Sequence, residues 1–255
     1  MTLPQFREEA EPALATARRA EESGLDGVFV FDHFWPLHQP DRPALQSTVL
    51  LGALAAETER VVLGPLVARV SVVPNAVLVD AYRTLHRMLG DRLLVTLGTG
   101  DSANRNENEA YGLGFSPVSE RIADLVACCR ALRADGVATW VGGRSPAVRR
   151  AAAEADGWNI WGVDAAGFAT EIVGLPVATS WGGQVLVGRT PEEAEEKLAR
   201  HGPRPGLVHG TVADLARHLR RLGDAGAAWA VCAPLDVGSD PLVVEYLAEA
   251  SAAAR

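Results

Sequence analysis

Short apolar runs rich in Val, Leu and aromatic residues alternate along the chain with Ala-, Glu- and Arg-rich segments of helical periodicity. This alternation is typical of parallel strands joined by crossover helices. Seven runs are interpreted as strands, at residues 28–31, 61–66, 92–97, 138–141, 158–161, 184–187 and 228–232. Residues 2–4 are interpreted as the remnant of a first strand. The sequence therefore predicts about eight parallel strands.

Amphipathic helices fill the intervals between these runs. Residues 8–23 end at Gly24, and residues 191–200 follow Thr190, a natural N-cap before a proline. A chain of 255 residues is long for one domain, but α/β barrels often reach this length as one unit. No repeat, low-complexity tract or linker divides it. We therefore expect residues 1–255 to form a single domain of the α/β class, a (β/α)8 TIM barrel.

Charge and hydropathy exclude several kinds of partner. The net charge of −8 disfavours binding to nucleic acid, because such binding depends on clustered Lys and Arg. No apolar run is long enough to span a membrane, and the N-terminus lacks the apolar centre of a signal peptide. We therefore expect a cytoplasmic protein with no nucleic-acid or membrane partner.

Two other barrel chemistries are disfavoured by residue placement. Lys197 is the only lysine and falls on a predicted surface helix, which disfavours a Schiff-base enzyme. His33 and His38 share a loop, whereas the other histidines are expected on helices or distant loops, so no metal site is expected. The three cysteines lack metal-ligand spacing and are interpreted as reduced core residues.

The loop after the run at residues 28–31 carries the densest chemistry. Asp32, His33, Phe34 and Trp35 place a carboxylate and an imidazole beside two aromatic rings. Active sites of barrel enzymes lie on the loops that follow the strands, and a histidine there can act as a general base. The alternative is that Asp32 caps a turn and His33 packs.

Two further loops could contact a ligand. Gly98, Thr99, Gly100, Asp101 and Asn104 combine glycines, which allow a backbone to approach a planar ligand, with polar side chains. In a second loop, free backbone N–H groups and an arginine suit a phosphate, although a simple capped turn is the alternative. The residues of this second loop are Val141, Gly142, Gly143 and Arg144.

Motifs in this order resemble the luciferase-like monooxygenase family. The segment 21–26 leads to Phe31-Asp32-His33-Phe34, and the later matches extend to Asn159 and, more weakly, to residues 187–194. These later matches are at residues 63–64, 74–76, 91–93, 98–100, 142–143 and 155–159. The motifs at residues 32–34 and 98–104, taken together, are more similar to the branch that uses coenzyme F-420, a deazaflavin, than to the FMN monooxygenases.

The resemblance implies roles for several of these residues. Asp32 and His33 are expected at the deazaflavin edge, with Leu66 and Val67 forming a strained, cis peptide behind the ring. Thr99, Gly100, Asp101 and Asn104 are expected to line the ring, and Val141, Gly142, Gly143 and Arg144 to meet the phosphate. We expect His33 and Asp101 to be the catalytic base and acid, and Phe34 and Trp35 to line the substrate pocket.

The favoured function is an F-420-dependent oxidoreductase that moves a hydride between the cofactor and a small organic substrate. The alternatives are an FMN-dependent monooxygenase with a flavin reductase partner, and a non-catalytic flavin-binding or interaction barrel. Departures from the family are an abbreviated first strand, a shortened insertion before the fifth strand, and Arg69 in the loop after the third strand. The resemblance also implies a homodimer formed through helices near the second and third strands.

Overall fold

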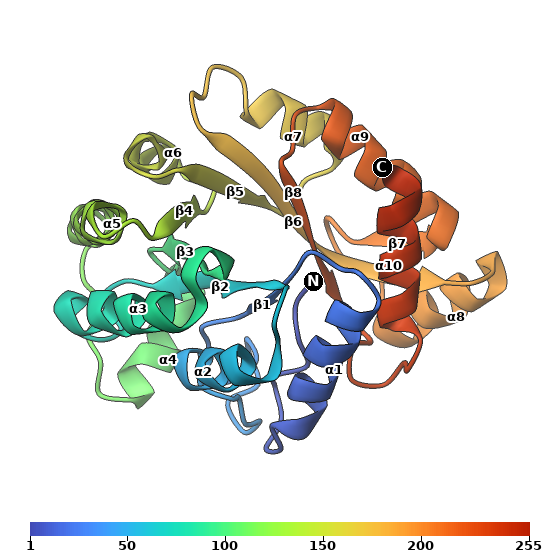
Figure 1. The fold of residues 1–255 in the computed structure, drawn as a ribbon, viewed down its shortest axis with the longest axis horizontal. Helices are drawn as coiled ribbons and strands as arrows, with labels where there is room; N and C mark the ends of the chain where they lie inside the picture. Colours follow the sequence, from blue (N-terminus) through green and yellow to red (C-terminus); the bar gives the residue numbers. More distant parts are fainter.

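The computed structural model describes residues 1–255 and contains eight strands in one parallel sheet. The strands are β1 (Gly27–Val30), β2 (Val62–Arg69), β3 (Leu94–Gly98), β4 (Ala138–Gly142), β5 (Gly157–Trp161), β6 (Ala178–Gly188), β7 (Val208–Thr211) and β8 (Trp229–Pro234). β1 to β6 pair in chain order, and β8 pairs with β6. The sheet curves into a ring surrounded by helices (Figure 1).

The N-terminal residues close this ring between β1 and β8. The Phe29 N–H donates to the Met1 carbonyl at 2.8 Å, and the Thr2 N–H donates to the Cys232 carbonyl at 3.0 Å. Thr2 also forms an isolated parallel bridge with Phe29. Of the first strand predicted at residues 2–4, only Thr2 forms a bridge of the sheet type. The closed ring is a barrel of the (β/α)8 type.

One strand was missed by sequence analysis. β7 (Val208–Thr211) pairs only with the carboxyl-terminal part of β6, over Val185 to Gly188, so it is not needed to close the ring. It has four residues, and its side chains are exposed or half-buried. A strand this short and this exposed lacks the apolar run that marks the others. His209, predicted on a helix or a distant loop, lies in it.

Helices form the outer layer of the barrel (Figure 1). They are α1 (Glu11–Glu22), α2 (Ser47–Glu57), α3 (Asn75–Leu89), α4 (Arg105–Ala110), α5 (Val118–Ala134), α6 (Pro146–Ala151), α7 (Ala165–Glu171), α8 (Pro191–His201), α9 (Val212–Asp224) and α10 (Val243–Ala254). Three 3₁₀ turns, η1 (Gly90–Arg92), η2 (Ser102–Asn104) and η3 (Ala152–Glu154), adjoin them. Thr190 accepts from the Glu193 N–H, so the predicted N-cap of α8 is confirmed.

The apolar side chains form two cores. A cluster of 49 buried residues fills the space between the strands and the surrounding helices. A second cluster of five buried residues occupies the barrel interior, with Val62, Val67, Trp161 and Trp229 packed against it. Its buried members are Phe29, Leu66, Leu94, Trp140 and Val231. The interior is therefore filled by side chains, as in other barrels of this type.

Lys197 corrects a prediction made from the sequence. It was expected on the surface of a helix, but its side chain on α8 is only 7% exposed. Its Nζ donates to the Val187 carbonyl at 2.6 Å and pairs with Asp240 and, at 2.9 Å, with Asp236. A buried ammonium needs such partners, because an unpaired charge is costly away from water. Its stem is covered because α8 packs on β6.

No helix combines the length and apolar character required to cross a membrane. No group of three or more His, Cys, Asp or Glu side chains is arranged to bind a metal ion.

Candidate active site

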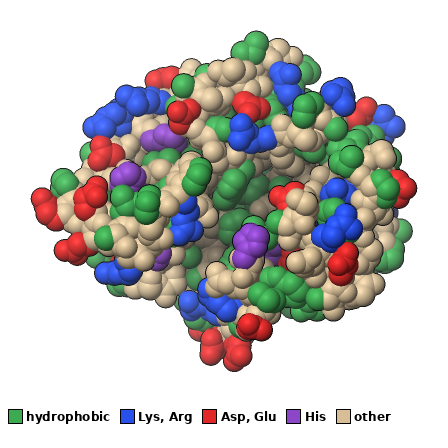
Figure 2. All heavy atoms as spheres, turned by 180° about the vertical axis from the view of Figure 1, so that it is seen from behind, with side chains coloured by type: hydrophobic (Ala, Val, Ile, Leu, Met, Phe, Trp, Pro, Cys, Tyr) green, Lys and Arg blue, Asp and Glu red, His purple; other side chains and the backbone are tan.

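The carboxyl ends of the strands form one face of the barrel, which we call the mouth. Phe31 and Asp32 follow β1, Arg69 ends β2, Gly98 ends β3, and Trp161 ends β5. Seen from the side opposite to Met1, the molecule is hollowed near its centre, with hydrophobic side chains on the floor and a histidine at the rim (Figure 2). The predicted loops therefore meet around one depression.

His33 is held in the mouth by a buried glutamate. Its Nδ1 lies 3.1 Å from Oε2 of Glu107, which is on α4, and the Glu107 side chain is only 1% exposed. The other Glu107 oxygen accepts from the Phe34 N–H. Because a carboxylate can only accept, Nδ1 must carry the proton in this contact. Nε2 of the neutral ring is then a hydrogen-bond acceptor, and it has no partner in the protein.

Arg69 completes this buried group. Its Nη1 donates to Glu107 Oε2 at 2.9 Å and to Asn108 Oδ1 at 3.2 Å. Burial by itself raises the pKa of Glu107, but the His33 hydrogen bond, the Arg69 charge and the Phe34 N–H outweigh it, and the net shift is downward. Glu107 is therefore held as a carboxylate that orients His33.

Two members of this buried group, Glu107 and Arg69, have positions that the sequence did not predict. Glu107 was not among the predicted site residues, and Arg69 was placed in a loop. Arg69 is instead the last residue of β2 and is 3% exposed. The available signal was the spacing of Asn104 and Glu107, which are three residues apart, with Asn104 at the N-cap of α4 and Glu107 in its first turn. The Asn104 Nδ2 donates to Glu107 at 3.3 Å, so both side chains do share one face.

Asp32 is engaged by protein groups on both of its oxygens. Ser47, at the start of α2, donates to Oδ1 at 2.8 Å, and the Arg69 backbone N–H donates to Oδ2 at 2.8 Å. The carboxylate thus fixes the loop after β1 to the end of β2. Its predicted contact with a cofactor edge stays a prediction.

Leu66 and Val67 are joined by a cis peptide bond, as expected from the family resemblance. Leu66 belongs to the interior cluster, and the half-buried Val67 packs against that cluster. A Cβ added at Gly98 or at Gly142 would lie 2.4 Å from a Val67 methyl group. These two glycines therefore make room for Val67, which contributes to an apolar floor.

Arg121 of α5 holds the loop after β3 in place. Its Nη1 donates to the carbonyls of Thr99, at 2.6 Å, and Gly100, at 2.8 Å. Asn104 is buried, and its Oδ1 accepts from the Asp101 N–H at 2.9 Å. The Asp101 carboxylate caps η2 through the Ala103 N–H and is exposed. The predicted acid therefore lies on the rim, and the carboxylate that contacts His33 is Glu107.

The loop after β4 was predicted to bind phosphate. Gly143 has a φ of 130°, and its carbonyl accepts from the Trp158 indole at 2.7 Å. The Arg144 guanidinium binds Glu171 at 2.8 Å on the surface. Val141 and Gly142 are buried in β4. A phosphate could reach this loop, but Arg144 would have to exchange Glu171 for it, and the assignment stays a prediction.

Aromatic rings line the mouth, including several that were not predicted. Phe34 stacks on Tyr111 with ring centroids 4.2 Å apart, and Trp35 lies 5.9 Å from the same ring. Phe31 lies between Phe6, at 5.9 Å, and Trp161, at 6.0 Å. Phe34 and Trp35 therefore share a wall with Tyr111. Phe6, Phe31 and Trp161 form a second cluster that the sequence could not connect.

The parallel strands form a closed ring, with a polar group and aromatic walls at their carboxyl ends. This is a barrel of the kind that serves as an enzyme scaffold. The model of the family described as luciferase-like monooxygenase matches residues 2–230. The chain belongs to this family.

Curated relatives match over part of the chain. A stretch of 118 residues is 36% identical to an F-420-dependent glucose-6-phosphate dehydrogenase of Kineococcus radiotolerans, covering 46% of this chain and 34% of the relative. The enzyme of the same name from Nakamurella multipartita is 36% identical over 107 residues, covering 42% and 31%. The matched segments thus span about a third of these relatives.

Solved structures with the same fold cover nearly the whole chain. An F-420-dependent secondary alcohol dehydrogenase with an F420-acetone adduct has a TM-score of 0.79 at 17% identity and covers 98% of this chain and 96% of its own. The F-420-dependent tetrahydromethanopterin reductase of Methanopyrus kandleri has a TM-score of 0.76 at 12% identity, covering 97% and 95%. An FMN-containing Baeyer-Villiger monooxygenase of Pseudomonas putida has a TM-score of 0.69 at 13% identity, covering 97% and 94%. At these sequence identities, the structural similarity shows that the fold is shared.

Proposed function

We propose that this protein is an oxidoreductase that uses coenzyme F-420 and acts on a small organic substrate bearing a hydroxyl group. The observation that carries the proposal is the contact of His33 with Glu107 in the mouth. It leaves an unpaired acceptor nitrogen where a substrate hydroxyl can reach it. The partial match to F-420-dependent dehydrogenases supports the choice of cofactor.

The residues of the mouth fit a planar, largely apolar ring. Val67, packed between Gly98 and Gly142, presents a smooth apolar floor without a charged group. Gly100 has a φ of 63°, a conformation that favours glycine, so the loop after β3 can turn here. Phe31 and Trp161 supply an aromatic wall. A deazaflavin bound there would supply the hydride acceptor.

His33 is the residue that transfers the proton in this reaction. When an alcohol is oxidised to a carbonyl, its C–H leaves as a hydride and its O–H as a proton. Nε2 of His33 can take that proton, after which the imidazolium is paired with the Glu107 carboxylate. Arg69 keeps Glu107 ionised through its own charge, so the developing positive charge on His33 is stabilised. In the reverse direction, the same ring donates a proton to a carbonyl.

The test is a binding titration with oxidised F-420 and, in parallel, FMN, followed by quenching of cofactor fluorescence. We expect saturable binding of F-420 and weaker binding of FMN. A screen of hydroxyl substrates, including glucose 6-phosphate, then follows the loss of oxidised F-420 absorbance. A preference for FMN would instead indicate a monooxygenase that needs a reductase partner, and binding of neither cofactor would contradict the proposal.

We also propose a homodimer through α2 and α3. Val49 on α2 is 73% exposed, and Val77 and Met88 on α3 are 56% and 54% exposed. Exposed large apolar side chains on two helices that pack together support an interface there. Light scattering coupled to gel filtration should show twice the mass of one chain. Val77→Glu together with Met88→Glu should give the monomer, and a wild-type monomer would refute the dimer.

A further inference from the structure

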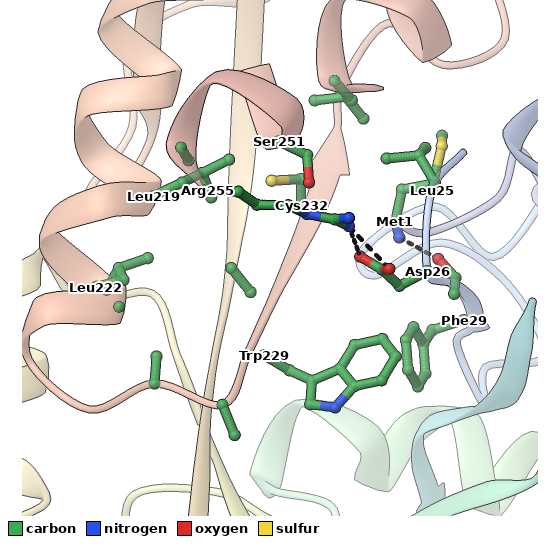
Figure 3. A pocket seen from close by; sticks show the side chains of 17 residues that line it. Met1, Leu25, Asp26, Phe29, Leu219, Leu222, Trp229, Cys232, Ser251 and Arg255 are labelled. Atoms are coloured by element: carbon green, nitrogen blue, oxygen red, sulfur yellow. Dashed lines mark hydrogen bonds and ion pairs between the residues drawn. The ribbon is translucent and has the colours of Figure 1, made fainter. Parts of the chain in front are cut away.

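A cavity of about 480 Å³ lies at the end of the barrel opposite to the mouth. We call it the amino-end cavity, because it adjoins the amino ends of β1 and β8 and lies between them and α9 and α10 (Figure 3). Small-molecule pockets have volumes of roughly 300–1,000 Å³. Residues that define the cavity include Met1, Gly27, Phe29, Gly223, Trp229 and Ser251.

Small residues leave this space open. Gly223 on α9, Ala227 and Ala228 before β8, and Ala254 on α10 line it and cannot fill it with side chains. Twelve of the 17 lining residues are hydrophobic. Phe29 and Trp229 meet edge to face at 6.0 Å at its inner end. Hydrophobic residues therefore predominate in the lining, and aromatic carbon lies at the base of the cavity.

The charged side chains of the cavity, Arg255 and Asp26, are paired with each other. The Arg255 side chain crosses from the end of α10 to Asp26 and contacts its two oxygens at 2.7 and 2.8 Å (Figure 3). The Met1 ammonium donates to the Gly27 carbonyl at 2.7 Å, and burial lowers the pKa of this amine to about 6. A charged ligand would lose its hydration there without gaining a free counter-charge.

We propose that the amino-end cavity is a second binding site, which takes an uncharged apolar molecule of the size of a substituted naphthalene. Such a molecule gains free energy by leaving water for apolar walls, and its rings can pack on Trp229 and Phe29. The cavity has the volume of a small-molecule pocket, so a compact molecule fits this site better than a protein segment. The site is separate from the mouth and does not depend on the proposed reaction.

A pair of fluorescent probes tests both the site and its charge preference. N-phenyl-1-naphthylamine is uncharged, and its 8-sulfonate differs only by the added anion. We expect saturable binding of one molecule of the uncharged probe per chain, and binding of the sulfonate weaker by about tenfold or more, because the anion must be desolvated. Equal or tighter binding of the sulfonate would overturn the proposal, as would no binding of the uncharged probe.

Matched variants locate the bound probe. A Cβ added at Gly223 meets no atom within 4 Å, so Gly223→Phe can extend into the cavity without a backbone clash. Gly52 on α2 is equally free of neighbours but lies outside the cavity. We expect Gly223→Phe to weaken binding by about tenfold or more and Gly52→Phe to leave it unchanged. Equal binding by both variants would place the probe elsewhere.

The unmodified chain offers a second readout if Gly223→Phe does not fold. The chain has two methionines, Met1 in the cavity wall and Met88 exposed on α3. In a sample with methyl-¹³C methionine, the uncharged probe should shift the Met1 resonance and leave Met88 in place. A shift of Met88 alone, or of neither signal at probe saturation, contradicts the proposal.

Discussion

Nδ1 of His33 and Oε2 of Glu107 lie 3.1 Å apart, although 74 residues separate them in the chain. The contact joins the loop after β1 to α4 and is completed by Arg69 from the end of β2. The loop after β1, the end of β2 and helix α4 therefore meet at one carboxylate.

Replacing His33 should remove proton transfer while leaving the barrel intact. The side chain is partly exposed, and Glu107 keeps its contacts to Arg69 and the Phe34 N–H. We expect His33→Ala to lower turnover by about 10²- to 10⁴-fold, a typical contribution of a general base. Steady-state kinetics with F-420 and a substrate from the screen give the rate, and fluorescence quenching gives cofactor affinity. A variant with unchanged turnover would exclude His33 as the base.

Neutralising Glu107 should cost both stability and activity. Glu107→Gln removes the nearer of the two carboxylates that pair with the buried Arg69 and leaves only Asp32, at 4.0 Å, a loss of about 3–5 kcal/mol in the free energy of unfolding. The control is Glu109→Gln on the same helix, where the side chain is 57% exposed. Urea unfolding compares the two variants. If both lose the same small amount, the buried ion pair does not stabilise the fold.

The Glu107 contacts also predict an acid dependence of stability. The folded-state pKa of Glu107 lies below its ordinary value of 4.5, so the folded state favours the carboxylate. Its contribution is complete above pH 4.5 and is lost as the pH falls through the lower folded value. We expect the free energy of unfolding to fall more steeply below pH 4.5 in the wild type than in Glu107→Gln. Parallel curves in urea at several pH values would contradict the assignment.

Gly98 and Val67 form a second testable pair. Gly98→Ala would place a Cβ 2.4 Å from a Val67 methyl, and such overpacking costs about 1–3 kcal/mol. Val67→Ala removes that methyl, so the double variant should lose less stability than the sum of the single losses. Gly52→Ala, with no atom within 4 Å, is the control and should be neutral or slightly stabilising. Additive losses in a thermal unfolding cycle would mean that the clash is relieved in another way.

The buried lysine gives an independent prediction. Lys197→Met leaves Asp236, which is 2% exposed, and Asp240 without their cation, at a cost of about 3–5 kcal/mol. Arg200→Met, at an exposed position of the same helix, should change stability by about 0.5 kcal/mol or less. Chemical unfolding of both variants checks the difference. An equal, small effect would mean that water reaches the two carboxylates.

Local patterns in the sequence were sufficient for the barrel class. Apolar runs of strand length marked seven of the eight strands, because a strand buried on both faces must be apolar throughout. The capped start of α8 at Thr190 followed from its own residues. β7 was missed because its half-exposed residues carry no such run. Lys197 was misplaced because helical position alone does not show which side chains a neighbouring strand covers.

The sequence by itself determined the order of strands and helices, the loops that carry polar side chains, and the family, since each depends on residues close together in the chain. Only the tertiary structure decided which of these side chains touch. Glu107 looks like any polar residue of a short helix, and it becomes the partner of His33 because ring closure brings the ends of β1, β2 and β3 together. The amino-end cavity likewise arises from small residues on elements far apart in the chain, whose packing no local pattern records.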